Sequence, residues 1–145
     1  MEKPMSTIPS LSTSLYSLTK NLPDVGFEDA VARVRAALAT EGFGVLTEID
    51  VQATLEKKLG VQTRPYLILG ACNPKLAHQA LQAEPVIGVL LPCNVVVAGD
   101  DHGGVVVSAV DPVAMFEIVR RPDIEPVAKE VRERLERVLA ALGGS

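Results

Sequence analysis

The sequence predicts a single α+β domain, a two-layer sandwich in which helices cover largely one face of a mainly antiparallel sheet of about five strands. A chain of 145 residues has the size of one domain. Hydrophobic periods typical of strands and of helices alternate along it in the order βαβαβαββαα. Two valine-rich runs, Cys93 to Ala98 and Gly104 to Val110, flank the polar turn Gly99-Asp100-Asp101-His102-Gly103 and predict an antiparallel hairpin.

The N-terminal part is expected to contain an arm, a strand and a helix. Residues 1–12 are rich in Ser, Thr and Pro, which predicts a flexible arm, and residues 13–145 are expected to form the domain. The alternating pattern of residues 13–20 predicts a first strand. Residues 27–41 carry apolar side chains at helical spacing, and Gly42 is a typical residue to end that helix.

Strands and helices continue to alternate in the middle of the chain. An aspartate and an Asn-Pro pair stand where helix N-caps are expected, and a glycine follows the first of the two helices. The second strand of this region is apolar on both faces, which predicts a central position in the sheet. The elements expected here are a strand over 44–49, a helix over 51–59, a strand over 64–71 and a helix over 74–83.

The segment before the hairpin is ambiguous, whereas the end of the chain is clearly helical. Residues 86–91 fit either a helical turn or extended chain. After the hairpin, Asp111-Pro112 opens a short helix that ends near Val119, and residues 124–142 form the longest helix. Its outer face is expected to carry the ion pairs Glu130–Arg134 and Glu133–Arg137.

The composition excludes several classes of partner. A net charge of −4 and an aromatic content of 3% leave no basic surface and few rings for bases to stack on, so no nucleic-acid partner is expected. No apolar run approaches the ~18 residues of a membrane span, so no membrane partner is expected. The N-terminus lacks the pattern of a secretory signal, which makes the cytoplasm the expected compartment. A mean hydropathy of +0.25 predicts a homodimer that covers apolar surface.

The candidate site is marked by a repeated dipeptide. The chain has two cysteines, and an asparagine directly follows each. Cys72 is expected between the end of a strand and the start of a helix, where small ligands commonly bind and where helix amides favour anions and thiolates. The expected ligand is a small anion or a thiol-reactive molecule, with Cys72 as the more reactive thiol. The residues assigned to this site are Gly70, Ala71, Cys72, Asn73, Cys93 and Asn94.

Both cysteines also have a purely structural interpretation, as small residues packed in the fold. Whether the two thiols meet is left open. The repeated motif favours a meeting, whereas a simple β-α-β crossover would make their strands parallel and separate them by roughly 16 Å. Antiparallel strands, or a segment 86–91 that returns along the sheet, would bring them together.

The sequence predicts no metal site, no cofactor and no defined catalytic group. His78 is expected on the outer side of its helix and His102 in the hairpin turn, and their spacing from the cysteines fits no compact zinc pattern. No local motif places a base beside either cysteine. The hypotheses are therefore a binding module, an assembly protein in which the motifs only shape the fold, and, behind these, a cysteine-dependent enzyme.

Four motifs occur in a recognisable order along residues 16–112. They are Gly42-Phe43-Gly44-Val45, Glu48-Ile49-Asp50, Leu67 to Pro74, and Leu91-Pro92-Cys93-Asn94. In these motifs the chain resembles the domain-of-unknown-function family numbered 302. The resemblance implies a small α+β protein of a family whose members often assemble as dimers. It implies no activity, because none is established for the family.

Overall fold

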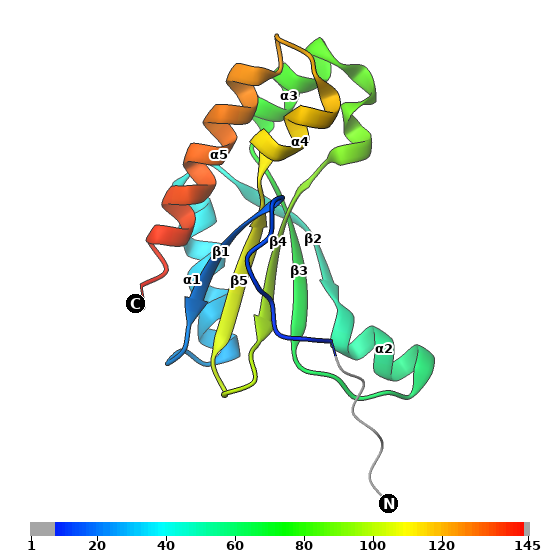
Figure 1. Cartoon of the computed structure of the whole chain (residues 1–145), viewed down its shortest axis with the longest axis vertical. Helices are drawn as coiled ribbons and strands as arrows, with labels where there is room; N and C mark the ends of the chain where they lie inside the picture. Colours follow the sequence, from blue (N-terminus) through cyan, green and yellow to red (C-terminus); the bar gives the residue numbers. More distant parts are fainter. Residues whose placement is uncertain (1–7, 144–145) are drawn as a thin grey trace, which may run out of the picture.

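Figure 1 shows the computed structural model of the protein, which describes residues 8–143. Five antiparallel strands with helices packed against them confirm the α+β fold expected from the sequence. The elements in chain order are β1 (Ser17–Leu22), α1 (Phe27–Thr40), β2 (Gly44–Asp50), α2 (Val51–Leu59), β3 (Tyr66–Cys72), α3 (Pro74–Ala83), the 3-10 helix η1 (Pro85–Leu90), β4 (Cys93–Gly99), β5 (Val105–Val110), α4 (Pro112–Val119) and α5 (Glu125–Ala140).

The sheet has the strand order β1-β5-β4-β3-β2, and every neighbouring pair is antiparallel. The valine-rich hairpin is confirmed as β4 and β5, in which Val97 lies opposite Val107. β3 lies between β4 and β2, which confirms that it is not an edge strand. The first strand begins later than expected, at Ser17, because its register with β5 starts where Ser17 faces Val110.

One face of the sheet packs against α1 and α5 and forms the core. Alternate residues of the central strands face these helices, as the two-residue period of a strand requires. Burial of each such aliphatic side chain stabilises the fold by roughly 1.5–3 kcal/mol relative to exposure. The side chains with no exposed surface include Val34, Leu38, Leu69, Val95, Val97, Val107 and Leu135.

Polar contacts join the long C-terminal helix to the end of α1. Arg134 donates from Nη1 to the carbonyl oxygen of Glu41 at 2.8 Å, and it also forms the predicted ion pair with Glu130 at 3.4 Å. Arg137 pairs with the carboxylate of Glu41 at 2.9 Å. The expected pair with Glu133 is therefore replaced, because the end of α1 brings another carboxylate within reach of Arg137.

The opposite face of the sheet has a thinner cover. Residues 8–14 run without regular secondary structure in front of this face before β1 begins (Figure 1). Ile8 and Leu11 are half-buried, while Ala98 and Val106, which point to this face, are buried. The arm expected over residues 1–12 lies partly outside the described residues.

The segment that the sequence left open is the short helix η1, and it decides the topology. α3 leads the chain away from the sheet, and η1 returns it so that β4 starts beside the end of β3. The parallel arrangement of a simple β-α-β crossover is therefore wrong for this pair. Within residues 8–143, no helix combines the length and the apolar character needed to cross a membrane.

Candidate functional site

The two cysteines lie at the same end of neighbouring strands. Cys93 begins β4 opposite Ala71 of β3, and Cys72 is the next residue along β3. The antiparallel register thus brings both Cys-Asn dipeptides to one end of the sheet. Both thiols are free, and both side chains are partly exposed.

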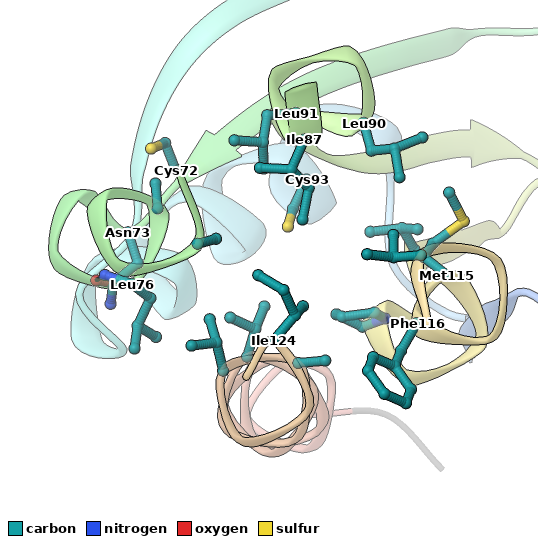
Figure 2. Close-up of a pocket in the computed structure, with 18 of the residues that line it drawn as sticks. Cys72, Asn73, Leu76, Ile87, Leu90, Leu91, Cys93, Met115, Phe116 and Ile124 are labelled. Carbon is teal, nitrogen blue, oxygen red and sulfur yellow. Dashed lines mark hydrogen bonds between the residues drawn. The ribbon is translucent and has the colours of Figure 1, made fainter. Parts of the chain in front are cut away.

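A cavity of about 90 Å³ lies beyond this end of the sheet, with α3 and η1 on one side and α4 and α5 on the other (Figure 2). A bound water needs about 10–15 Å³ and two to four polar partners. The cavity has the room but few such partners, because its walls are aliphatic and aromatic apart from Asn73 and the two thiols. Representative lining residues are Ala71, Leu76, Leu90, Cys93, Met115 and Val127.

The two thiols have different orientations although both residues border the cavity. Figure 2 shows the sulfur of Cys93 pointing into the cavity and the sulfur of Cys72 pointing away from it. This difference follows from the register, because Ala71 is the residue that faces Cys93 and successive strand residues point to opposite faces. The cavity therefore presents one thiol, that of Cys93, to a guest.

Burial raises the pKa of the Cys93 thiol to about 11, and the neighbouring Cys72 adds a smaller increase because two adjacent thiolates repel each other. At pH 7, only about one Cys93 thiol in ten thousand is therefore ionised. Cys93 presents a neutral, polarisable S–H group to the cavity rather than a nucleophilic thiolate.

Asn73 has the capping role expected from the sequence. Its Oδ1 accepts a hydrogen bond from the backbone N–H of Leu76 at 3.2 Å, and its Nδ2 donates to the carbonyl oxygen of Glu41 at 3.5 Å. Gly42 has a φ of 81°, and a Cβ at this position would lie 2.9 Å from Asn73 Nδ2. The Gly-Phe-Gly motif and the Asn-Pro motif thus meet, and together they fix the start of α3 against the end of α1.

Gly70 and Asn94 lie outside the cavity lining. They face each other across β3 and β4, one residue out of phase with the pair Ala71 and Cys93. A Cβ on Gly70 would collide with Thr47 Oγ1 and would lie 2.8 Å from Cγ of Pro92. The glycine is required because these side chains pack directly on the backbone of β3. Of the six residues assigned from the sequence, the cavity is lined by Ala71, Cys72, Asn73 and Cys93.

Most of the cavity wall comes from elements that no sequence motif had marked. Met115 and Phe116 of α4, and Ile124 just before α5, border the same space as the thiol of Cys93 (Figure 2). A signal was present in the sequence, since α4 is apolar at nearly every position. Such a helix is normally buried, yet none of the residues of α4 is fully buried. The helix packs against α5, and the rest of its inner side borders the cavity.

The cavity contains no charged group and no metal-binding cluster. Of the residues that the structure describes, none that lines the cavity is acidic or basic. His78 and His102 are both exposed, and across residues 8–143 no group of three or more His, Cys, Asp and Glu side chains could hold a metal ion. The arrangement suits the binding of an uncharged molecule.

Comparison with known proteins identifies the family. The model of the "Domain of unknown function DUF302" matches residues 18–142. The chain belongs to the DUF302 family. The crystal structure of an uncharacterized conserved DUF302 protein from Bacillus stearothermophilus is similar to it, with a TM-score of 0.82 and 27% sequence identity over 90% of this chain and 100% of that one. No curated protein matches the chain. Membership of the DUF302 family establishes the fold and assigns no activity.

Proposed function

We propose that this DUF302 protein binds a small, uncharged and largely apolar molecule in the cavity, in contact with the thiol of Cys93. The observation that carries the proposal is the cavity of about 90 Å³, whose lining is almost entirely apolar and into which the Cys93 sulfur points. An apolar cavity of about 150 Å³ engineered in another protein stays dry and binds benzene, which makes a small apolar guest the first ligand class to test here.

The packing of the surrounding helices supports this proposal. Neither α4 nor η1 contains a fully buried residue, although both are strongly apolar. A guest in the cavity would supply the contacts that their inner sides lack, at roughly 0.8 kcal/mol for each buried CH₂ group. For a six-carbon ring this amounts to about 5 kcal/mol, which corresponds to a Kd of a few hundred micromolar.

Fluorobenzene is a suitable ligand for the test, because its ¹⁹F resonance reports binding directly. We expect saturable binding and chemical-shift changes for the amides of Ala71, Met115 and their neighbours. At ten times Kd, the ligand should stabilise the protein by about 1.4 kcal/mol and raise Tm by roughly 4–6 °C.

Two variants make the test specific to the cavity. Ala77→Leu in α3 adds a side chain at a lining position and should abolish binding. Ala36→Leu is the matched control, because Ala36 lies on the exposed side of α1, outside the lining, and this variant should bind as the wild type does. Absence of fluorobenzene binding to the wild type, or equal binding by Ala77→Leu, would refute the proposal.

A small anion at the start of α3 is the ligand class that the helix amides would favour. Asn73 already occupies the N–H of Leu76, and no charged side chain of the described residues lines the cavity, so we rank the anion second. Titration with inorganic phosphate tests this alternative. Chemical-shift changes of the Lys75 and Leu76 amides, together with thermal stabilisation by phosphate, would show that the ligand is an anion and not an apolar molecule.

A cysteine-dependent enzyme is a weaker alternative, because such catalysis needs a base beside the thiol and no lining residue of the described chain provides one. Free thiols are compatible with a reducing compartment, and we retain the cytoplasm as the proposed location.

Assembly as a homodimer is a second candidate function, favoured by the surface around β2. α2 has no buried residue, and an isolated helix of this length is marginal in water. Leu46, Ile49 and Leu59 are exposed on β2 and α2. We infer that a second copy covers this surface. Light scattering at micromolar concentrations should give the mass of a dimer, and Ile49→Lys should shift it toward the monomer; a monomeric wild type would contradict this inference.

A further inference from the structure

We propose that the ion pair between Glu84 and Arg121 is a clasp that controls the exchange of ligand with the cavity, by holding α4 against the wall formed by α3 and η1. The proposal rests on the function proposed above, and it adds the route and the control of entry. Opening of the clasp would let α4 move outward and widen the path by which the ligand enters the half-open cavity between η1 and α4.

The clasp joins the two opposite walls of the cavity. Glu84 lies between α3 and η1, and Arg121 lies just after the end of α4. Arg121 Nε donates to Glu84 Oε2 at 2.7 Å, and Arg121 Nη2 contacts the same oxygen. Along the chain, each partner is three residues from a cavity residue, Ile87 on one wall and Ile124 on the other.

α3 packs against α5, but few polar interactions join the two walls. Among the hydrogen bonds and ion pairs of residues 8–143, the contact between Glu84 and Arg121 is the one that connects α3 and η1 with α4 and α5. The outer side chains of both walls are apolar and face solvent: Val86 and Val89 on η1 are 68% and 81% exposed, and Ile118 on α4 is 72% exposed. The outer sides of η1 and α4 are therefore not covered by other elements of the described chain.

The two ends of α4 are held differently, which gives the helix a fixed end and a releasable end. At its start, the buried Asp111 accepts a hydrogen bond from the N–H of Val113 at 2.9 Å and lies 3.7 Å from Arg132 of α5. At its other end, Arg120 has a left-handed conformation with a φ of 54°, and the chain turns there toward α5. Release of Arg121 would loosen this second end, which then keeps its contacts with α5, while Asp111 holds the first.

The size of the effect follows from the exposure of the pair. Arg121 is 52% exposed and Glu84 is 20% exposed. Loss of an ion pair with this degree of exposure changes the equilibrium between the closed and open positions of α4 by up to about fivefold. Neither residue belongs to the lining. Loss of the ion pair should therefore raise the association and dissociation rate constants of the ligand by the same factor and leave Kd nearly unchanged. Added salt should accelerate exchange in the wild type, because salt screens an exposed ion pair.

The experiment measures exchange of fluorobenzene between free and bound states by ¹⁹F NMR at equilibrium. Arg121→Gln and Glu84→Gln should each exchange about three- to fivefold faster than the wild type, without the salt dependence. The doubly reversed variant, Glu84→Arg with Arg121→Glu, should return toward the wild-type rate. Arg35→Gln is the control, because it removes an ion pair of similar exposure, with Glu48 at 2.6 Å, remote from the cavity.

Amide hydrogen exchange provides a readout that needs no ligand. In Arg121→Gln, the amides near the end of α4 should exchange several-fold faster, while those of α1 and β4 stay as in the wild type. Unchanged ¹⁹F exchange rates in both single variants, with fluorobenzene still bound, would overturn the clasp and leave the proposed function standing. Failure of the wild type to bind fluorobenzene would overturn both. A thermal melt of each variant excludes general unfolding as the cause of faster exchange.

Discussion

Selective reactivity of the two cysteines is the most direct test of the site geometry. Cys72→Ser leaves only the Cys93 thiol, whose sulfur points into the apolar cavity, and Cys93→Ser leaves only the Cys72 thiol, whose sulfur points away from it. We expect the Cys93→Ser variant to react rapidly with an aromatic disulfide reagent and the Cys72→Ser variant to react slowly. The sequence alone already favoured Cys72 as the more reactive thiol, and burial of Cys93 gives the expectation a physical cause.

The magnitude follows from the pKa of Cys93, which is raised from 9.0 to about 11 mainly by burial, with a smaller contribution from Cys72 that Cys72→Ser removes. At pH 8, this shift lowers the fraction of thiolate by about one hundredfold relative to an ordinary thiol. A thiolate of higher pKa is intrinsically more nucleophilic. With a Brønsted coefficient of about 0.4–0.5, the rate constant of the Cys93 thiolate is raised by a factor of roughly eight, which offsets part of the hundredfold decrease. The net expectation is that Cys93 reacts more than about tenfold more slowly than an unperturbed thiol, and restricted access to the cavity adds to this difference.

The assay is a time course of thiol titration for both variants at pH 8, with and without urea. In urea both thiols should react at similar rates, because the cavity is lost. The proposed orientation of the two thiols is refuted if Cys93 reacts as fast as Cys72 in the folded protein. It also fails if neither thiol reacts before unfolding, because both would then be packed in the interior.

Three further predictions concern stability. Because the pKa of Cys93 is raised in the folded state from 9.0 to about 11, its stabilising contribution is present below about pH 9 and is lost as the pH rises toward 11. Urea unfolding should show the wild type losing on the order of 2 kcal/mol relative to Cys93→Ala over this range. Gly70→Ala should destabilise the protein by about 1–3 kcal/mol through its collision with neighbouring side chains, whereas Gly44→Ala, at an exposed position of β2 where a Cβ meets no atom within 4 Å, should be neutral or stabilising. Asn73→Ala should lower the free energy of unfolding by about 0.5–2 kcal/mol through loss of the cap, and Asn73→Asp, which keeps an acceptor for Leu76, should recover most of it.

The sequence predicted the elements well because most of them are fixed by local chemistry. Asp50 and Asn73 cap the helices that follow them, and Gly60 ends α2 in a left-handed conformation, as expected from their residue types. The hairpin followed from two valine-rich runs around a polar turn. The start of the first strand differs from the prediction, because it depends on pairing with a distant strand: β1 begins at Ser17, which lies opposite Val110, the last residue of β5.

The cavity could not be predicted in the same way, because it depends on how distant segments pack. Its wall joins residues from α3, η1, α4 and α5, and most of them lie outside every motif. Those that carried a motif are Phe43, Ala71, Cys72, Asn73, Leu91 and Cys93. The course of residues 86–91 was ambiguous in sequence, and this segment is the one that returns the chain and makes β3 and β4 antiparallel. The apolar composition of α4 indicated burial, but composition does not distinguish burial under other side chains from contact with a cavity.

The repeated Cys-Asn dipeptide suggested two equivalent halves of one site, and the register explains why they are not equivalent. Cys93 faces Ala71 rather than Cys72, so the two cysteines are out of phase by one residue. A one-residue difference in a strand reverses the direction of the side chain. Cys93 consequently points into the cavity and Cys72 points away, while Asn73 caps a helix and Asn94 is exposed on the strand. A register in which the cysteines faced each other would favour a redox pair or a shared metal ion. The observed register instead leaves a single neutral thiol in an apolar wall, which is the arrangement expected of a binding cavity.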